Sequence, residues 1–169
     1  MGKQLDHTSH DVKGKFSLSI LAHQLKSPYN LGVIFRLTDA LGVKKLYLSG
    51  DTILPPNRKI SKTSRSTEKS VYYEQVDNIQ EFIQNLKNDG VLIVALELCD
   101  NSIPIEEIIL PDNAEVCLIL GEENYGVNPE LLSAADMIGH IPMQGHNSSM
   151  NVASACAIAA YSLINKLKK

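Results

Sequence analysis

Residues 116–126 read VCLILGEENYG: five consecutive apolar residues, followed at once by a polar loop that begins and ends with glycine. An apolar run without alternation predicts a strand buried on both faces, as in a parallel sheet. In open α/β sheets, ligands bind beyond the carboxyl ends of the strands, where this loop would lie. The loop has neither the Lys-Ser/Thr of a P-loop nor a GxGxxG pattern, so a plain strand-to-helix connection remains an alternative.

The same alternation of strands and helices extends outward from this stretch in both directions. Further strands are predicted at residues 17–22, 45–48, 71–75, 91–96 and 137–141. Helices are predicted at residues 30–41, 79–86, 129–135 and 151–166, with a single turn near 104–108. Residues 55–69 read as polar and irregular, and residues 1–15 as a flexible polar arm. We therefore expect one α/β domain over residues 1–169, with a mostly parallel sheet and helices on both faces.

Composition places the chain among ordinary globular proteins. Hydrophobic residues make up 44% and charged residues 21% of its 169 residues, and the net charge is -3. No signal peptide or membrane-spanning segment is predicted. Cys99, Cys117 and Cys156 lie in apolar runs without metal or redox spacing, which predicts buried reduced thiols. We expect a cytoplasmic protein that binds neither a membrane nor a metal ion.

The densest basic segment lies in residues 58–69. A net-acidic chain has no global positive field, so any contact with nucleic acid must be local. The candidate RNA-binding residues in this segment are Arg58, Lys59, Lys62 and Arg65. Serines and threonines between them can also reach phosphate oxygens. A merely solvated loop is the alternative interpretation.

A second unusual segment is residues 30–36, NLGVIFR, at the start of a predicted helix. Asn30 can cap the helix. A glycine in the first turns costs ~1 kcal/mol relative to alanine, so Gly32 needs a reason. Arg36 follows Gly32 by four residues and shares its face, so we expect open space above Gly32 with Arg36 reaching over it. A solvated surface arginine is the alternative.

The third segment is residues 141–151, IPMQGHNSSMN, which follows the last predicted strand. Asn147, Ser148, Ser149 and Asn151 crowd into five positions, which is more hydrogen-bonding capacity than a helix cap requires. Ser148 or Ser149 is expected to cap the final helix. His146 has no partner residue at a spacing that would indicate a catalytic role, and it is interpreted as an ordinary loop histidine.

The final predicted helix, residues 151–166, has almost no polar face. A helix that is apolar all round is either buried in the core or pressed against a partner. Core burial and a homodimer interface both remain open from the residues alone.

In their order along the chain, the three polar segments resemble the motifs of the SpoU (TrmH-like) tRNA/rRNA 2′-O-methyltransferases of the SPOUT superfamily. Residues 30–36 resemble the Asn-x-Gly-x-x-x-Arg motif. Gly121, Glu123 and Gly126 match Gly-x-Glu-x-x-Gly, and residues 141–151 resemble Ile-Pro-Met…Ser-x-Asn. The resemblance runs from about residue 17 to the C-terminus. Asn124 and Met150 depart from it, where glycine and leucine are frequent.

This resemblance implies an α/β fold with a C-terminal trefoil knot, a homodimer, tRNA or rRNA as substrate, and S-adenosyl-L-methionine as cofactor. The implied cofactor contacts are Leu96, Gly121, Ile141, Met143 and Ser149. The implied catalytic residue is Arg36, with Asn30, Glu123, Ser149 and Asn151 around it.

Two roles for Arg36 remain open at this point. Arginine stays protonated in proteins, so action as a general base needs an unusual environment. Binding of the adjacent phosphate and stabilisation of developing alkoxide charge is the milder role. Two other functions also stay open: a non-catalytic RNA-binding protein with this fold, and a small-molecule α/β enzyme with a nucleotide cofactor.

Overall fold

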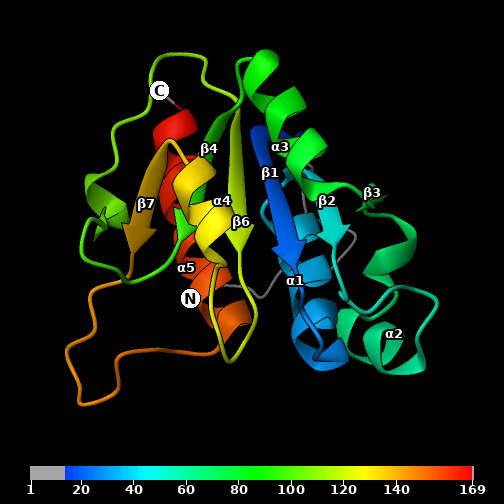
Figure 1. The fold of residues 1–169 in the computed structure, drawn as a ribbon. Helices are drawn as coiled ribbons and strands as arrows, with labels where there is room; N and C mark the ends of the chain where they lie inside the picture. The colour runs from blue at the N-terminus through cyan, green and yellow to red at the C-terminus, as the bar shows by residue number, and fades with distance from the viewer. Residues whose placement is uncertain (1–13, 169) are drawn as a thin grey trace, which may run out of the picture.

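The computed structural model describes residues 14–168, so the predicted arm at residues 1–15 lies almost wholly outside the described part. Its centre is a seven-stranded sheet in the order β3-β2-β1-β6-β4-β7-β5 (Figure 1). The strands are β1 (Phe16–His23), β2 (Val43–Ser49), β3 (Tyr73–Val76), β4 (Leu92–Leu96), β5 (Ile103–Pro104), β6 (Val116–Leu120) and β7 (Met137–His140). Every pair of neighbouring strands is parallel. This confirms the predicted α/β class; the trefoil knot stays a prediction.

Strand β6 lies in the middle of the sheet, between β1 and β4. All five of its side chains are buried. Neighbouring side chains point to opposite faces of a strand, so a strand covered on both sides needs an apolar residue at every position. Burial of each large side chain contributes about 1.5–3 kcal/mol, which accounts for the unbroken apolar run.

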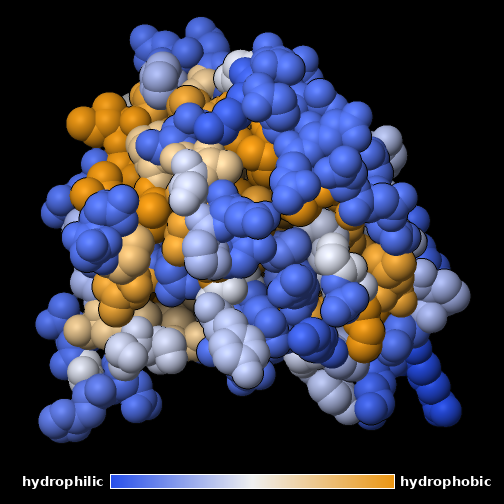
Figure 2. Space-filling model, in the orientation of Figure 1, coloured by the Kyte–Doolittle hydropathy of each residue, from blue (hydrophilic) through white to orange (hydrophobic). Residues whose placement is uncertain are grey.

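Helices cover both faces of this sheet (Figure 1). The helices are α1 (Pro28–Ala40), α2 (Arg58–Ser64), α3 (Ile79–Asn88), α4 (Pro129–Ala134) and α5 (Val152–Leu167), with 3₁₀ turns η1 (Thr67–Lys69) and η2 (Ile105–Glu107). Helices α1, α2 and α5 share one apolar core with the sheet. Helices α3 and α4 form a second core on the other face. On the face drawn in Figure 2, hydrophilic residues cover α3.

The prediction of an irregular segment at residues 55–69 was wrong. The structure has helix α2 there, followed by η1. Asn57 caps α2 by accepting the backbone N–H groups of Lys59, at 2.9 Å, and Ile60, at 3.3 Å. Ile60 is fully buried. A single apolar residue gives no periodicity, which is why the sequence pattern did not reveal this helix.

A buried carboxylate completes the segment. Glu68 is 7% exposed and accepts hydrogen bonds from the hydroxyls of Ser61, at 2.6 Å, and Ser64. Although burial alone would raise the pKa of Glu68, these hydroxyl bonds lower it below its ordinary value. The one acidic side chain of the basic segment therefore points inward, and its basic side chains remain outside.

Two predicted helix caps were also wrong. Helix α1 begins at Pro28, and Ser27 is its cap, accepting the N–H of Asn30 at 3.3 Å. Proline is well placed in a first helical turn, and this moves Asn30 inside the helix. Helix α5 is capped by Asn151 rather than by Ser148 or Ser149. These two serines are thus left free for another use.

The cysteine prediction holds for two residues of three. Cys117 and Cys156 are fully buried, and burial raises the pKa of each thiol to about 12. Cys99 is only partly buried, because it lies after the end of β4, where its thiol contacts Asn101. The predicted turn near residues 104–108 is the short edge strand β5 followed by η2.

Candidate functional site

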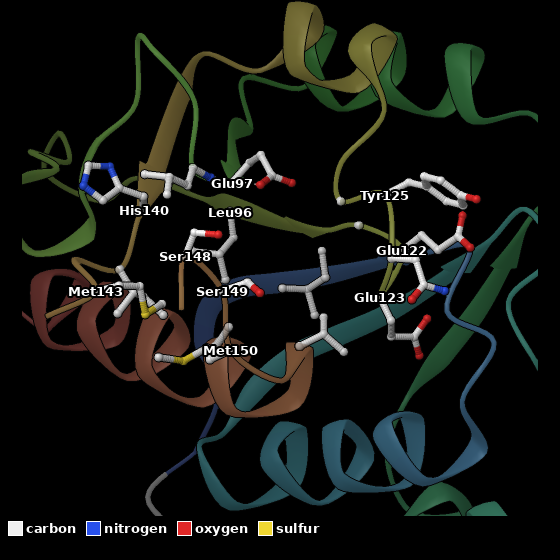
Figure 3. A pocket seen from close by; sticks show the side chains of 18 residues that line it. Leu96, Glu97, Glu122, Glu123, Tyr125, His140, Met143, Ser148, Ser149 and Met150 are labelled. Atoms are coloured by element: carbon white, nitrogen blue, oxygen red, sulfur yellow. Dashed lines mark hydrogen bonds between the residues drawn. The ribbon is translucent and has the colours of Figure 1, made fainter. Parts of the chain in front are cut away.

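A cavity of about 330 Å³ opens where β4, β6 and β7 end (Figure 3). Its walls come from the end of β4, the loop at 121–126, the segment at 140–150 and the first turn of α5. Known small-molecule pockets have roughly 300–1,000 Å³, so the cavity is large enough for a cofactor. It lies at the carboxyl edge of the sheet, as expected from the loop that follows β6.

The structure brings together all five predicted cofactor contacts. The residues Leu96, Gly121, Ile141, Met143 and Ser149 all line this cavity. They come from three separate segments of the chain, which meet only because β4, β6 and β7 end side by side.

The loop after β6 is a tight turn closed by backbone hydrogen bonds. Glu122 and Gly126 exchange both of their N–H···O bonds, at 3.0 and 2.9 Å. A Cβ on Gly121 would lie 2.1 Å from the carbonyl carbon of Gly126. Gly126 itself has a φ of +69°, which favours glycine. Gly121 is thus required because backbone meets backbone there, and Gly126 because of its positive φ and the close approach of the Glu97 side chain.

Glu97, which sequence reasoning missed, holds this loop against the end of β4. Its carboxylate accepts the N–H of Val127 at 2.8 Å and that of Leu98 at 3.0 Å. A Cβ on Gly126 would lie 2.0 Å from its Oε2. Its position directly after a buried strand was the only signal in the sequence.

Three of the predicted catalytic residues form one hydrogen-bonded chain. The carboxylate of Glu123 accepts the side-chain amide of Asn30 at 3.2 Å and the backbone N–H groups of Ser27, at 3.1 Å, and Lys26, at 3.3 Å. Asn30 Oδ1 in turn accepts from Asn151 Nδ2 at 2.9 Å. One residue from each of the three sequence motifs therefore takes part, and each motif fixes the orientation of the next.

These contacts also set the charge of Glu123. Partial burial alone would raise the pKa of this carboxyl group, but the hydrogen bonds from Asn30 and from the backbone N–H groups of Ser27 and Lys26 outweigh it and hold the pKa below its ordinary value. Glu123 is therefore ionised at neutral pH and acts only as an acceptor. The ammonium of Lys26 lies 3.2 Å from the neighbouring Glu122.

Arg36 and Ser149 stand outside this cluster. Arg36 is exposed on α1 and has no ion pair or side-chain hydrogen bond within residues 14–168. Ser149 is exposed and lines the cavity, likewise without a hydrogen bond in that part of the chain. Exposed His146 lies outside the cavity lining.

The expected open space above Gly32 is filled by helix α2. A Cβ on Gly32 would lie 2.7 Å from the Cβ of Thr63 and 2.9 Å from the carbonyl oxygen of Ile60. The glycine thus allows α2 to pack closely on α1. The prediction that Gly32 leaves open space for a ligand was wrong.

This packing places the basic segment beside the helix that carries Asn30 and Arg36. The four predicted RNA-binding residues, Arg58, Lys59, Lys62 and Arg65, are all exposed. None of them takes part in an ion pair within the described residues. Their positive charge is therefore available to an anionic partner.

Comparison with known proteins decides the family. The model of the SpoU rRNA Methylase family matches residues 17–161. This chain belongs to the SpoU rRNA methylase family. It is 34% identical over 146 residues to the 23S rRNA (guanosine(2553)-2′-O)-methyltransferase RlmP of Bacillus subtilis. This match covers 85% of this chain and 56% of the relative. It is 29% identical to the tRNA (guanosine(18)-2′-O)-methyltransferase of Escherichia coli, over 85% of this chain and 61% of that protein. The chain thus spans less than two thirds of the length of these two relatives.

Solved structures agree with this membership. The AdoMet-bound rRNA methyltransferase of Sinorhizobium meliloti superposes with a TM-score of 0.83 at 26% identity, covering 95% of this chain and 59% of that one. A structure described as giving insights into 2-OH methylation of C/U34 on tRNA has a TM-score of 0.79 at 25% identity. It covers 89% of this chain and 96% of its own length.

The cavity of this SpoU family chain suits a nucleoside cofactor. Leu96, Ile141 and Met143 supply apolar walls for a flat ring. His140 also lines the cavity, and its Nδ1 is the one buried side-chain nitrogen or oxygen that lacks a hydrogen-bond partner among residues 14–168. An unpaired buried polar atom costs about 1–3 kcal/mol, so a ligand that bonds to it is favoured. Sequence reasoning missed His140, which ends β7.

Residues 14–168 contain no group of three or more His, Cys, Asp or Glu placed to hold a metal ion. Within the same residues, no helix has the length and apolar character needed to cross a membrane.

Proposed function

We propose that this SpoU family chain transfers a methyl group from S-adenosylmethionine to a ribose 2′-oxygen of tRNA or rRNA. The observation that carries the proposal is the hydrogen-bonded chain from Glu123 through Asn30 to Asn151, beside a cofactor-sized cavity. The names of the relatives from Bacillus subtilis and Escherichia coli, both 2′-O-methyltransferases, support the same chemistry. The AdoMet in the related Sinorhizobium meliloti structure supports the cofactor.

When bound, the cofactor would supply an electrophilic sulfonium methyl. The residues proposed to hold it are Leu96, Gly121, Ile141, Met143 and Ser149. His140 would form part of the same cavity wall.

The chain must then align the ribose hydroxyl, whose proton would pass to water in the open cavity as the oxygen gains the methyl group. Glu123 fixes the orientation of the Asn30 amide, and Asn151 holds the other side of that amide. Glu123 and Asn151 therefore act through Asn30, and the side-chain amide of Asn30 would contact the ribose. Ser149 adds a free hydroxyl on the cavity wall.

For Arg36 we propose the electrostatic role. Arginine is in general a poor proton acceptor, and Arg36 is exposed, so that an RNA phosphate can reach it. We assign it to the phosphate beside the target ribose, where its positive charge stabilises the developing alkoxide. Its lack of a partner in residues 14–168 leaves all of its N–H donors available to RNA.

The basic surface of Arg58, Lys59, Lys62 and Arg65 is proposed to bind the RNA backbone. These side chains lie on α2, or in the case of Arg65 at its end, next to α1. Unpaired cations release counterions from RNA when they bind phosphates, which supplies affinity without sequence preference. The cytoplasm, where RNA is accessible and thiols stay reduced, is the proposed compartment.

A homodimer is proposed through helix α5. One side of α5 is buried in the core, whereas Ile158 and Tyr161 on its other side are 44% and 58% exposed. Together with η2, these two residues line a second, open cavity of about 520 Å³. Exposed apolar side chains beside such a hollow are typical of a protein interface.

Two measurements on the purified chain test the proposal. Calorimetry should show binding of S-adenosylmethionine, and labelled methyl should pass from it into unmodified total RNA. RNA binding without transfer would support the non-catalytic alternative instead. Binding of NAD or ATP, with none of S-adenosylmethionine, would support the small-molecule enzyme.

A further inference from the structure

The turn at residues 122–126 presents one large side chain to solvent. Tyr125 is 84% exposed. Its ring makes no aromatic contact and its hydroxyl no hydrogen bond within residues 14–168. A single exposed aromatic side chain is ordinary on a protein surface. Tyr125 differs from such a residue because it lines the cavity described above, where its ring can contact a bound partner.

The backbone that carries Tyr125 is held in place. Two hydrogen bonds between Glu122 and Gly126 close the turn around it. Glu97 fixes the following residue, Val127, at 2.8 Å. Glu123, two residues before Tyr125, is tied to Ser27 and Asn30. A ring on such a fixed turn loses little backbone entropy when it binds a ligand.

Tyr125 also stands at the end of the cavity where the ribose must enter. In Figure 3 it lies beside Glu122 and Glu123, at the opposite end from His140 and Met143. Glu123 contacts Asn30, so this end holds the polar cluster proposed to receive the ribose. The apolar end is left for the cofactor.

The charges around the ring indicate which part of an RNA fits there. Glu122, Glu123 and Lys26, which is paired with Glu122 at 3.2 Å, leave a net negative charge beside the ring, and this disfavours a phosphate. A carboxylate can instead accept a hydrogen bond from a nucleobase amino group. Unstacked bases of single-stranded RNA bind to exposed aromatic rings in many RNA-binding proteins. The RNA phosphates would instead bind to the basic surface on α2.

We propose that Tyr125 stacks on an unstacked base of the substrate RNA, at or next to the methylated nucleotide. This inference rests on the proposed function, because it places the target ribose at the Glu123 end of the cavity. Tyr125 then sets RNA affinity and positioning, and takes no part in cofactor binding or in the proton transfer.

The test compares Tyr125→Ala with Tyr125→Phe, which keeps the ring. Tyr72→Ala is the matched control, because Tyr72 is 59% exposed just before β3, at the edge of the sheet. Each protein, with residues 1–169, is assayed for the Kd of total RNA from cells lacking this chain, measured with S-adenosylhomocysteine present. The KM for RNA, the Kd of S-adenosylmethionine and the sedimentation coefficient are measured in parallel.

Loss of one base stack is expected to weaken RNA binding by Tyr125→Ala about tenfold and to raise KM to a similar extent. Tyr125→Phe and Tyr72→Ala should stay within about twofold of the unmodified chain. Cofactor affinity and sedimentation should not change. Unaltered RNA binding by Tyr125→Ala would overturn the inference, as would a loss that follows weaker cofactor binding or dissociation into monomers. Absence of any methyl transfer by the unmodified chain would count against the proposed function alone, since RNA binding is read without turnover.

Discussion

The amide of Asn151 donates to the side-chain oxygen of Asn30 at 2.9 Å, across 121 positions of the chain. Asn151 also caps α5, because its own oxygen accepts the N–H of Ala153 at 3.0 Å. The start of the last helix is therefore tied to the first turn of α1. Asn30 in turn donates a hydrogen bond to Glu123. A substitution at any of these three residues should therefore change the orientation of the other two side chains.

Replacement of Asn30 by alanine should impair catalysis and leave cofactor binding intact. The change removes the amide that links Glu123 and Asn151, and loss of positioning at a reacting group costs roughly 10²-fold in rate. Single-turnover methyl transfer with saturating cofactor measures the effect. Asn88→Ala, at the exposed end of α3, is the control. A normal rate for Asn30→Ala would remove this residue from the site.

Acid should loosen the contact of the 121–127 loop with α1. The folded-state pKa of Glu123 lies below its ordinary value, so its ionised form stabilises the fold above the unfolded-state pKa. That stabilisation is lost as the pH falls through the folded-state pKa. Urea midpoints measured between about pH 7 and about pH 3 should fall more steeply for the unmodified chain than for Glu123→Gln. Parallel curves would contradict this, and Glu107→Gln, at an exposed position, serves as control.

Addition of one methyl group at Gly121 should destroy the cofactor cavity. Its Cβ would meet the backbone of Gly126 at 2.1 Å, so the turn that closes the cavity has to move. Gly145→Ala, in the 141–151 segment, adds the same group where no atom lies within 4 Å. Calorimetry with S-adenosylmethionine should show no binding by Gly121→Ala and normal binding by Gly145→Ala. Equal affinities would show that the cofactor does not depend on this turn.

Charge reversal at Arg58 and Arg65 should weaken RNA binding and flatten its dependence on salt. Removal of a single cation–phosphate interaction reduces the slope of log K against log salt by about 0.7–0.9. Filter binding over a salt series measures both quantities. Lys87→Glu, on α3 across the sheet, changes charge without touching the proposed surface. Identical slopes for the double variant and the unmodified chain would exclude α2 from the interface.

Much of the fold could be predicted because local patterns report burial directly. The apolar run of β6 indicated a central parallel strand, and Ile79, Phe82, Ile83 and Leu86 indicated α3 by their spacing. Helix α2 was not predicted, because Ile60 is its one buried apolar side chain. Its serine hydroxyls bind the buried carboxylate of Glu68, and in the sequence Glu68 looks like any surface glutamate.

The site could be predicted residue by residue, whereas its geometry could not. Three motifs identified Asn30, Glu123 and Asn151, but no spacing reveals a hydrogen bond between residues so far apart. Gly32 and Gly121 were singled out as unusual glycines, but the expected open space above Gly32 is filled by α2. Both make room for the chain's own backbone, a tertiary contact that depends on how helices and loops pack. No motif position identifies Glu97, His140 or Tyr125 as functional. They were recognised only because they line the cavity.

We expect this chain to methylate ribose with the help of Arg36. The most direct measurement is transfer of radiolabelled methyl from S-adenosylmethionine into unmodified total RNA, followed by alkaline hydrolysis, with Arg36→Ala beside the unmodified chain. Label is expected in alkali-resistant dinucleotides for the unmodified chain, and its loss is expected in Arg36→Ala with cofactor binding unchanged. Label found only in mononucleotides, or full transfer by Arg36→Ala, would contradict it.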